Sequence, residues 1–135
     1  MLFRSLGNLE AKRDWGFAGD YVEAMWRMLQ HERADDFVIA TGVAHSVREF
    51  LELSCSLVAL VPEDVVRIDE RYYRPTEVDE LVGDPSKAER ILGWRATMRF
   101  EELAATMLLS DLKSFDVDTQ RYDRLHELAG NAATR

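Results

Sequence analysis

The spacing of apolar residues restricts this chain to a fold built mainly from short helices. Apolar side chains recur every three or four positions within residues 20–31, 46–60 and 100–112, which places them on one face of a helix in each stretch. A fourth, shorter helix is expected over residues 85–92. Residues that begin or end helices lie at the edges of these stretches. Asp20 is expected to begin the first helix, a Ser46–Glu49 capping box the second, and Asp84 with Pro85 the short fourth one. Pro62 follows the end of the second helix and Gly93 the end of the fourth.

Strand signals are fewer and shorter than the helical ones. Phe37–Ala40 has the pattern of a buried strand, Val65–Ile68 of a partly exposed one, and Leu2–Leu6 is a third candidate. We therefore predict a mixed α/β fold of about four helices with two or three short strands, over residues 1–112. Residues 113–135 form a poorly patterned tail that is expected to fray from Gly130 onward.

Composition narrows the class of protein. The chain has 135 residues, with 17 Lys and Arg against 25 Asp and Glu, a net charge of −8; this suits one domain or a piece of a larger one, and argues against a nucleic-acid partner. No apolar run is long enough to cross a membrane, and the first residues show no signal peptide. The single cysteine, Cys55, is expected to be a buried apolar residue and excludes an internal disulfide. We expect a soluble, cytoplasmic protein.

Two loops concentrate cationic side chains in this acidic chain. Lys12 and Arg13 lie in residues 7–19, and Arg71 and Arg74 in residues 71–84, beside aromatic and acidic residues. An Arg guanidinium can bind a phosphate through two parallel hydrogen bonds. The alternative is that each Arg pairs with a nearby carboxylate on a solvated surface.

Three segments resemble the carboxy-terminal part of the GDP-mannose 4,6-dehydratase family, which belongs to the extended short-chain dehydrogenases. They are residues 6–26 with the motif Arg-Asp-Trp-Gly, residues 35–50, and residues 71–94 with the motif Arg-Pro-Thr-Glu. The likeness runs from Leu6 to about Leu112. The three tryptophans Trp15, Trp26 and Trp94 all stand where the family has them.

The resemblance implies a fold, an activity and a cofactor. The family's fold is NAD(P)-binding and Rossmann-like, and this chain would be its substrate-binding part. Members are lyases of nucleotide-sugar metabolism: with NADP they convert GDP-mannose to GDP-4-dehydro-6-deoxy-mannose, the precursor of GDP-fucose, by oxidising C4, eliminating water across C5 and C6 and reducing C6. A Tyr-x-x-x-Lys pair, a Ser or Thr and a Glu carry that chemistry, and a Gly-x-x-Gly-x-x-Gly turn holds the dinucleotide.

This sequence lacks those catalytic and dinucleotide-binding motifs. It contains no Gly-x-x-Gly-x-x-Gly turn, and no tyrosine has a lysine four residues on. We therefore expect a carboxy-terminal fragment, inactive alone, with no catalytic, cofactor-binding or metal-binding residues. Its expected partners are GDP-mannose, an amino-terminal half on a separate chain and a further copy of itself. The apolar faces Val22–Leu29 and Val47–Val58 should lack partners and leave an exposed patch.

The resemblance assigns substrate-binding roles to four residues. Arg13 and Arg74 match the family's two arginines for the sugar-nucleotide diphosphate, and Lys12 is a weaker candidate for the same anion. Glu77 matches the residue that accepts hydrogen bonds from the ribose hydroxyls. Phe17 replaces a histidine that is common in the family.

The other polar and aromatic residues are expected to be structural. Asp14, Asp20 and Asp79 should cap helices or pair with the arginines. Trp15 and Trp94 should pack against the missing half or in the local core rather than stack on guanine. The three histidines, His31, His45 and His126, lack metal-ligand spacing.

Alternative functions remain open at this point. The chain can be a non-catalytic module that binds nucleotide sugars, or a structural or assembly remnant without a reaction. A sibling nucleotide-sugar epimerase or reductase is a further alternative, since those enzymes share the Arg before the first helix and an Arg-Pro-x-Glu/Asp loop.

Overall fold

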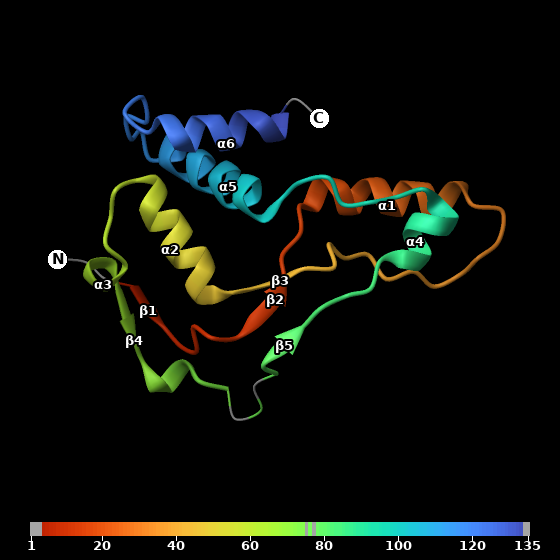
Figure 1. Ribbon diagram of the computed structural model, residues 1–135, viewed down its shortest axis with the longest axis horizontal. Coiled ribbons are helices and arrows are strands. Elements are labelled where there is room, and N and C mark those ends of the chain that lie inside the picture. The colour runs from red at the N-terminus through yellow and green to blue at the C-terminus, as the bar shows by residue number, and fades with distance from the viewer. Residues whose placement is uncertain (1–3, 75, 77, 134–135) are drawn as a thin grey trace.

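A computed structural model describes residues 4–74, 76 and 78–133 (Figure 1). Its elements follow in chain order: β1 (Arg4–Leu6), β2 (Lys12–Asp14), α1 (Ala18–Gln30), β3 (Ala44–Ser46), α2 (Val47–Leu57), α3 (Pro62–Val65), β4 (Val66–Ile68), the 3₁₀ turn η1 (Glu70–Tyr72), β5 (Glu80–Leu81), α4 (Ser86–Leu92), α5 (Phe100–Ser114) and α6 (Asp123–Ala133). The mixed α/β character agrees with the expectation, with more helices and more very short strands than the sequence indicated.

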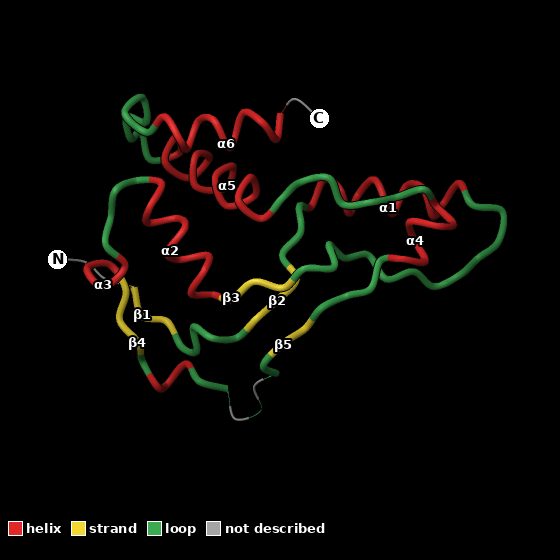
Figure 2. The backbone as a smooth tube through the Cα atoms, in the orientation of Figure 1, coloured by secondary structure: helices red, strands yellow, loops and turns green. Residues whose placement is uncertain are grey.

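The strands form two small sheets rather than one large one (Figure 2). β1 and β4 pair in parallel, with Arg4 opposite Val66. In the second sheet β2 is central: it pairs antiparallel with β3 and parallel with β5. The second sheet therefore joins three segments that are far apart in the sequence.

Two separate clusters of buried side chains hold the helices. In the first, Ala24 of α1 and Ala88 of α4 pack around Trp94, which is 1% exposed. In the second, Leu57 of α2 meets Ala105 of α5 and Leu125 of α6. Figure 1 shows the two groups on opposite sides of the short strands, with α1 and α4 in one and α2, α5 and α6 in the other.

The capping box at the start of α2 is confirmed. The Ser46 hydroxyl accepts from the Glu49 backbone N–H at 3.0 Å, and the Glu49 carboxylate accepts from the Ser46 N–H at 2.5 Å. Helix α2 ends at Leu57 rather than Leu60, because Ala59 adopts a left-handed conformation (φ 57°) and the Leu60 N–H turns back to the Cys55 carbonyl. Cys55 is buried, as expected.

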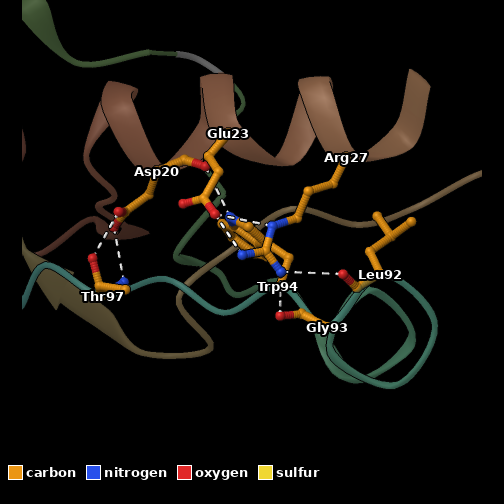
Figure 3. Close-up of polar contacts among 7 residues, drawn as sticks. All are labelled: Asp20, Glu23, Arg27, Leu92, Gly93, Trp94 and Thr97. Atoms are coloured by element: carbon orange, nitrogen blue, oxygen red, sulfur yellow. Dashed lines mark hydrogen bonds and ion pairs between the residues drawn. The ribbon is translucent and has the colours of Figure 1, made fainter. Parts of the chain in front are cut away.

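Helix α4 ends at Leu92 as predicted, and it begins one residue later than predicted, at Ser86. Asp84 accepts a hydrogen bond from the Ser86 backbone N–H at 2.9 Å, so the helix begins at Ser86 and Pro85 precedes it. Gly93 has a positive φ of 61°, the left-handed stop that the sequence predicted. The Arg27 guanidinium of α1 also donates to the carbonyl oxygens of Leu92 and Gly93 at the end of α4 (Figure 3).

The expectation that Asp20 caps α1 is wrong. The helix begins two residues earlier, at Ala18, after Phe17, which makes no side-chain cap. Asp20 is buried in the first turn, where its carboxylate accepts from the backbone N–H groups of Thr97 and Met98 and from the Thr97 hydroxyl, at 2.8–3.1 Å (Figure 3). Donors at a helix start and donors far along the chain can both bond a carboxylate. The sequence pattern favoured the donors of the adjacent helix start, because only those are near in sequence.

Two of the three predicted strands form. Val66–Ile68 is β4, and β1 occupies the described part of Leu2–Leu6. The prediction of a strand at Phe37–Ala40 is wrong, because no other segment of the described chain lies beside it with the hydrogen-bonding pattern of a strand.

The carboxy-terminal residues are more ordered than predicted. Helix α6 extends through Ala133 and packs along α5, so the frayed tail expected from Gly130 is wrong for the described residues. The α2 face that was expected to lack a partner packs on other elements: Leu57 meets Ala105 of α5 and Leu125 of α6, and Phe50 contacts the rings of Trp15 and Phe100.

Candidate functional site

Strand β2 carries two of the four predicted site residues, Lys12 and Arg13. It is the middle strand of its sheet, where Arg13 lies opposite His45 of β3 and Leu81 of β5. Nη1 of Arg13 donates to the carbonyl oxygens of Lys12 at 2.6 Å and Val78 at 2.8 Å. The backbone carbonyl groups of Lys12 and Val78 therefore help to hold the guanidinium in place.

The segment that follows Arg74 returns to β2. Besides Val78, the carbonyl oxygen of Asp79 accepts from the Lys12 backbone N–H at 2.8 Å, and β5 then pairs with β2. Arg74 lies in this segment with an exposed side chain, and within the described residues its guanidinium makes no hydrogen bond or ion pair. The fourth predicted residue, Glu77, lies outside the described residues.

Asp14 anchors the loops around Arg13. One carboxylate oxygen accepts from the backbone N–H of Thr41 at 2.9 Å and from its hydroxyl at 2.6 Å; the other accepts from the Gly42 N–H at 2.9 Å and the Gly83 N–H at 3.4 Å. Asp14 therefore has a structural role, and these contacts show which parts it joins: it links β2 to the loops before β3 and after β5.

A cavity of about 310 Å³ lies against Arg13 and Asp14. Tyr21 of α1 lines it from one side, and Leu81 and Gly83 from another. Burial, and then the carboxylates of Asp14 and Asp20, raise the pKa of the Tyr21 phenol above its usual value. Tyr21 and Arg13 thus line the same cavity.

The other arginine of the second loop is occupied. Arg71 makes a two-pronged ion pair with Asp69, with its closest contact at 2.6 Å. The hydrogen bonds from Arg71 lower the pKa of the Asp69 carboxyl. This is the surface pairing that the alternative interpretation expected for every Arg, and it applies to Arg71.

A larger cavity, of about 670 Å³, opens between the two helical groups. Trp15 forms part of its wall and donates its indole N–H to the His45 carbonyl. His45 stacks on Phe100 with ring centroids 3.9 Å apart, and Arg95 and Arg99 lie at the same opening. Of the predicted site residues that the structure describes, none of Lys12, Arg13 and Arg74 lines this cavity.

The sequence reasoning missed the residues that shape the first cavity. Tyr21 was considered only as a catalytic tyrosine, and the carbonyls of Val78 and Asp79 carry no sequence signal. The sequence offered one indirect signal. If Arg13 and Arg74 bind one ligand, backbone contacts must hold their two loops together.

The described residues form neither a dinucleotide crevice nor a metal cluster. The parallel pairs β1–β4 and β2–β5 are only two or three residues long, so residues 4–74, 76 and 78–133 form no doubly wound sheet with a dinucleotide crevice. Over the same residues, no group of three or more His, Cys, Asp or Glu side chains could hold a metal ion. None of the helices in this part of the chain is long and apolar enough to cross a membrane.

Similarity to known sequences covers most of the chain. A family model described as "GDP-mannose 4,6 dehydratase" matches residues 3–107. GDP-mannose 4,6 dehydratase 1 from Arabidopsis thaliana is 57% identical over 80% of this chain and 30% of its own length. The human GDP-mannose 4,6 dehydratase is 47% identical over 81% and 34%, respectively. This chain therefore spans about a third of the length of the curated relatives it matches.

Solved structures share the fold. A putative epimerase from Burkholderia cenocepacia superposes with a TM-score of 0.71 at 28% identity, covering 80% of this chain and 35% of that one. RMD from Pseudomonas aeruginosa, solved in complex with NADPH, gives a TM-score of 0.70 at 22% identity, covering 82% and 35%.

Proposed function

The chain belongs to the GDP-mannose 4,6-dehydratase family, and from that premise we propose that its β2 strand and the segment before β5 bind the diphosphate of GDP-mannose. The observation that carries the proposal is the return of the Arg74 segment to β2. Val78 and Asp79 accept hydrogen bonds from Arg13 and Lys12, so the segment that follows Arg74 returns to the strand that carries the other two cationic residues.

The chemistry of these residues suits a diphosphate. Two guanidinium groups can contact several non-bridging oxygens, and charge-assisted hydrogen bonds are stronger than neutral ones. Lys12 adds a third positive charge on the same strand. Glu77 is proposed to accept hydrogen bonds from the ribose hydroxyls, and the Tyr21 phenol, which lines the same cavity as Arg13, is proposed to donate to the same ligand.

We propose that the family's reaction requires residues that this chain does not supply. The reaction needs a hydride acceptor and an acid–base pair, and the sequence has neither the glycine-rich turn nor a Tyr-x-x-x-Lys pair. NADP would therefore bind to a separate nucleotide-binding part. The isolated chain is proposed to bind GDP-mannose weakly and to catalyse nothing, in a cytoplasmic setting and with a capacity to form homo-oligomers.

Two other functions stay as alternatives. A non-catalytic module or an assembly remnant would keep the fold whether or not GDP binds. An epimerase or reductase would use a similar pair of arginines, but the identity to dehydratases over 80% of the chain favours the dehydratase.

A binding titration with paired variants tests the proposal. GDP and GDP-mannose should bind with a dissociation constant on the order of millimolar, because two charged contacts offset only part of the cost of association. Arg74→Ala should weaken binding about tenfold or more, which corresponds to one charge-assisted contact. Arg71→Ala is the matched control: it removes the same charge from the same loop, but from a side chain already paired with Asp69.

Binding of pyrophosphate, which lacks the ribose, distinguishes the proposed diphosphate contact from the proposed ribose contact. Glu77→Gln should weaken GDP and leave pyrophosphate unchanged, whereas Arg74→Ala should weaken both. Equal losses from Arg71→Ala and Arg74→Ala would contradict a specific clamp and leave only a general charge effect. Turnover of GDP-mannose by the purified chain would contradict its proposed inactivity.

A further inference from the structure

The cavity between the two helical groups has the size and the wall of a small-molecule site. Its volume of about 670 Å³ lies within the usual range of ligand pockets. Trp15, His45 and Phe100 give it an aromatic wall, in which His45 stacks on Phe100 and Trp15 packs on Phe50. These rings come from the segment after β2, from β3 and from the start of α5, so the fold alone brings them together.

Two arginines lie at the opening of this cavity. Arg95 and Arg99 are both exposed, and over residues 4–74, 76 and 78–133 neither guanidinium makes a hydrogen bond or an ion pair. A guanidinium that no carboxylate engages is available to bind an anion through two parallel hydrogen bonds.

The backbone that carries the two arginines is fixed. Asp20 accepts from the amides of Thr97 and Met98, at 2.9 and 3.1 Å, and Figure 3 shows the first of these bonds. Glu102 accepts from the Arg99 amide at 2.9 Å. Both carboxylates are buried and hold this backbone in place. The two cationic side chains therefore extend from an ordered segment, which lowers the entropy that is lost when they bind a ligand.

The charge of the wall differs from that of the whole chain. The chain has a net charge of −8, but the described residues that line the cavity include two arginines and one acid, Glu101. The hydroxyls of Thr41 and Thr97, which also line it, already donate to aspartates. The guanidinium groups are thus left to bind the polar part of a ligand, while the aromatic wall suits a planar ring.

We propose that this cavity binds a small molecule that joins a planar aromatic ring to a phosphate group. The ring lies against Trp15 and Phe100, and the phosphate binds Arg95 and Arg99. A mononucleotide and a simple aryl phosphate share this chemistry and differ in the ribose between ring and phosphate. The described cationic residues of the proposed diphosphate contact do not line the cavity, so the inference does not rest on the proposed function.

Titrations with phenyl phosphate and methyl phosphate test the two parts of the site. The two probes carry the same charge, and only the first has a ring, so phenyl phosphate should bind about tenfold more tightly. Arg95→Ala should weaken phenyl phosphate about tenfold, because it removes a charge-assisted contact. Arg90→Ala is the matched control: Arg90 is an exposed arginine of α4 that does not line the cavity, so binding should be unchanged.

Two further variants test the ring and the sign of the charge. Phe100→Leu keeps an apolar side chain but removes the aromatic face, so it should reduce the preference for phenyl over methyl phosphate. Glu101→Gln removes the like charge at the opening and should tighten both probes about twofold. The urea midpoint shows whether each variant is folded. Arg95→Ala and Glu101→Gln change exposed side chains, so they keep the test decisive if Phe100→Leu unfolds.

Adenosine monophosphate distinguishes the two sources of the ligand. Tighter binding than phenyl phosphate assigns the cavity to a mononucleotide, and weaker binding assigns it to an aryl phosphate without ribose. Equal affinities for phenyl and methyl phosphate, or equal losses from Arg95→Ala and Arg90→Ala, would overturn the proposal.

The same variants separate this cavity from the proposed diphosphate contact. Arg74→Ala should leave phenyl phosphate binding unchanged, and Arg95→Ala should leave pyrophosphate binding unchanged, so either proposal can fail without the other. Loss of phenyl phosphate binding in Arg74→Ala would place that ligand at the diphosphate contact and overturn the assignment of the cavity.

Discussion

The buried carboxylate of Asp20 joins the start of α1 to the segment between α4 and α5. It accepts three hydrogen bonds from Thr97 and Met98, and the Asp20 backbone carbonyl accepts a fourth from the Trp94 indole at 2.8 Å. Asp20 is buried, and these hydrogen bonds to its charged carboxylate hold the segment after Trp94 against the start of α1.

We expect Asp20→Ala to lower the free energy of unfolding by about 2 kcal/mol, since it removes three hydrogen bonds to a charged carboxylate whose donors are partly open to water. Urea unfolding measures the effect. Asp20→Asn keeps one acceptor oxygen and should lose less. A change in Asp20→Ala below about 0.5 kcal/mol, the range of ordinary surface substitutions, would show that water replaces the carboxylate.

Glu49 predicts a dependence of stability on pH. The Ser46 backbone N–H, which donates to its carboxylate, lowers the pKa of Glu49 below its ordinary value of 4.5. A lowered pKa in the folded state means that the ionised carboxylate contributes stability above pH 4.5 and loses it as the pH falls through the lower, folded value.

The urea midpoint of the wild-type chain should therefore exceed that of Glu49→Gln at pH 7, and the difference should shrink as the pH falls below 4.5. A difference that stays constant with pH would mean that the capping geometry matters and the charge does not.

The residue types predicted a contact correctly where its two partners lie within a few residues of each other in the sequence. The Ser46–Glu49 box and the αL glycine at 93 follow from short spacing rules, because both ends of each interaction lie within one helical turn. Asp14 and Asp20 have partners 27 and 77 residues away, so their residue types indicated a structural role without identifying what they hold.

Helix α6 completes the second cluster at the scale of elements. Leu125 is fully buried between α2 and α5, whereas Phe115, in the connection before α6, is 80% exposed. Leu125→Ala should cost about 3 kcal/mol, the usual range for a buried leucine, and Phe115→Ala should cost almost nothing. Thermal and urea unfolding check both; equal small effects would show that α6 is docked only loosely.

Helices were predicted more reliably than strands for a physical reason. A helix satisfies its own backbone, so the apolar spacing in residues 100–112 located α5 correctly. A strand needs a partner: Phe37–Ala40 has the right residues but finds none in the described chain. Helix α6 was missed because its apolar positions are sparse and become meaningful only when α2 and α5 lie beside it.

At the scale of the whole molecule, the two clusters are linked through the short strands, the segment pinned by Asp20 and the ring contact of Trp15 with Phe50. We expect them to unfold separately. Fluorescence of Trp94 reports the first cluster, whereas exchange of the α5 and α6 amides reports the second. Asp20→Ala should shift the first transition to lower urea and leave the second nearly unchanged; coincident transitions in both chains would establish a single cooperative unit.

The candidate site could be predicted only in part at this scale. The sequence identified one segment of the site, from its cationic residues Lys12 and Arg13 and from the resemblance of their motif. In the structure this segment is β2, the central strand of its sheet. The return of the second loop depends on β5 pairing with β2 across 65 or more residues, and no local pattern encodes that pairing.

The interleaving of the two clusters sets an order for folding during synthesis. The chain supplies α1 to the first cluster, α2 to the second, α4 to the first, and α5 and α6 to the second. The first cluster has all its parts once Thr97 has left the ribosome, while the second, in which α5 packs on α2, is complete only when Leu125 of α6 is released. The final eleven-residue helix is therefore a quality checkpoint of the nascent chain: a premature stop before residue 123 yields a polypeptide with one finished core and one open, which is the form that chaperones and proteases recognise.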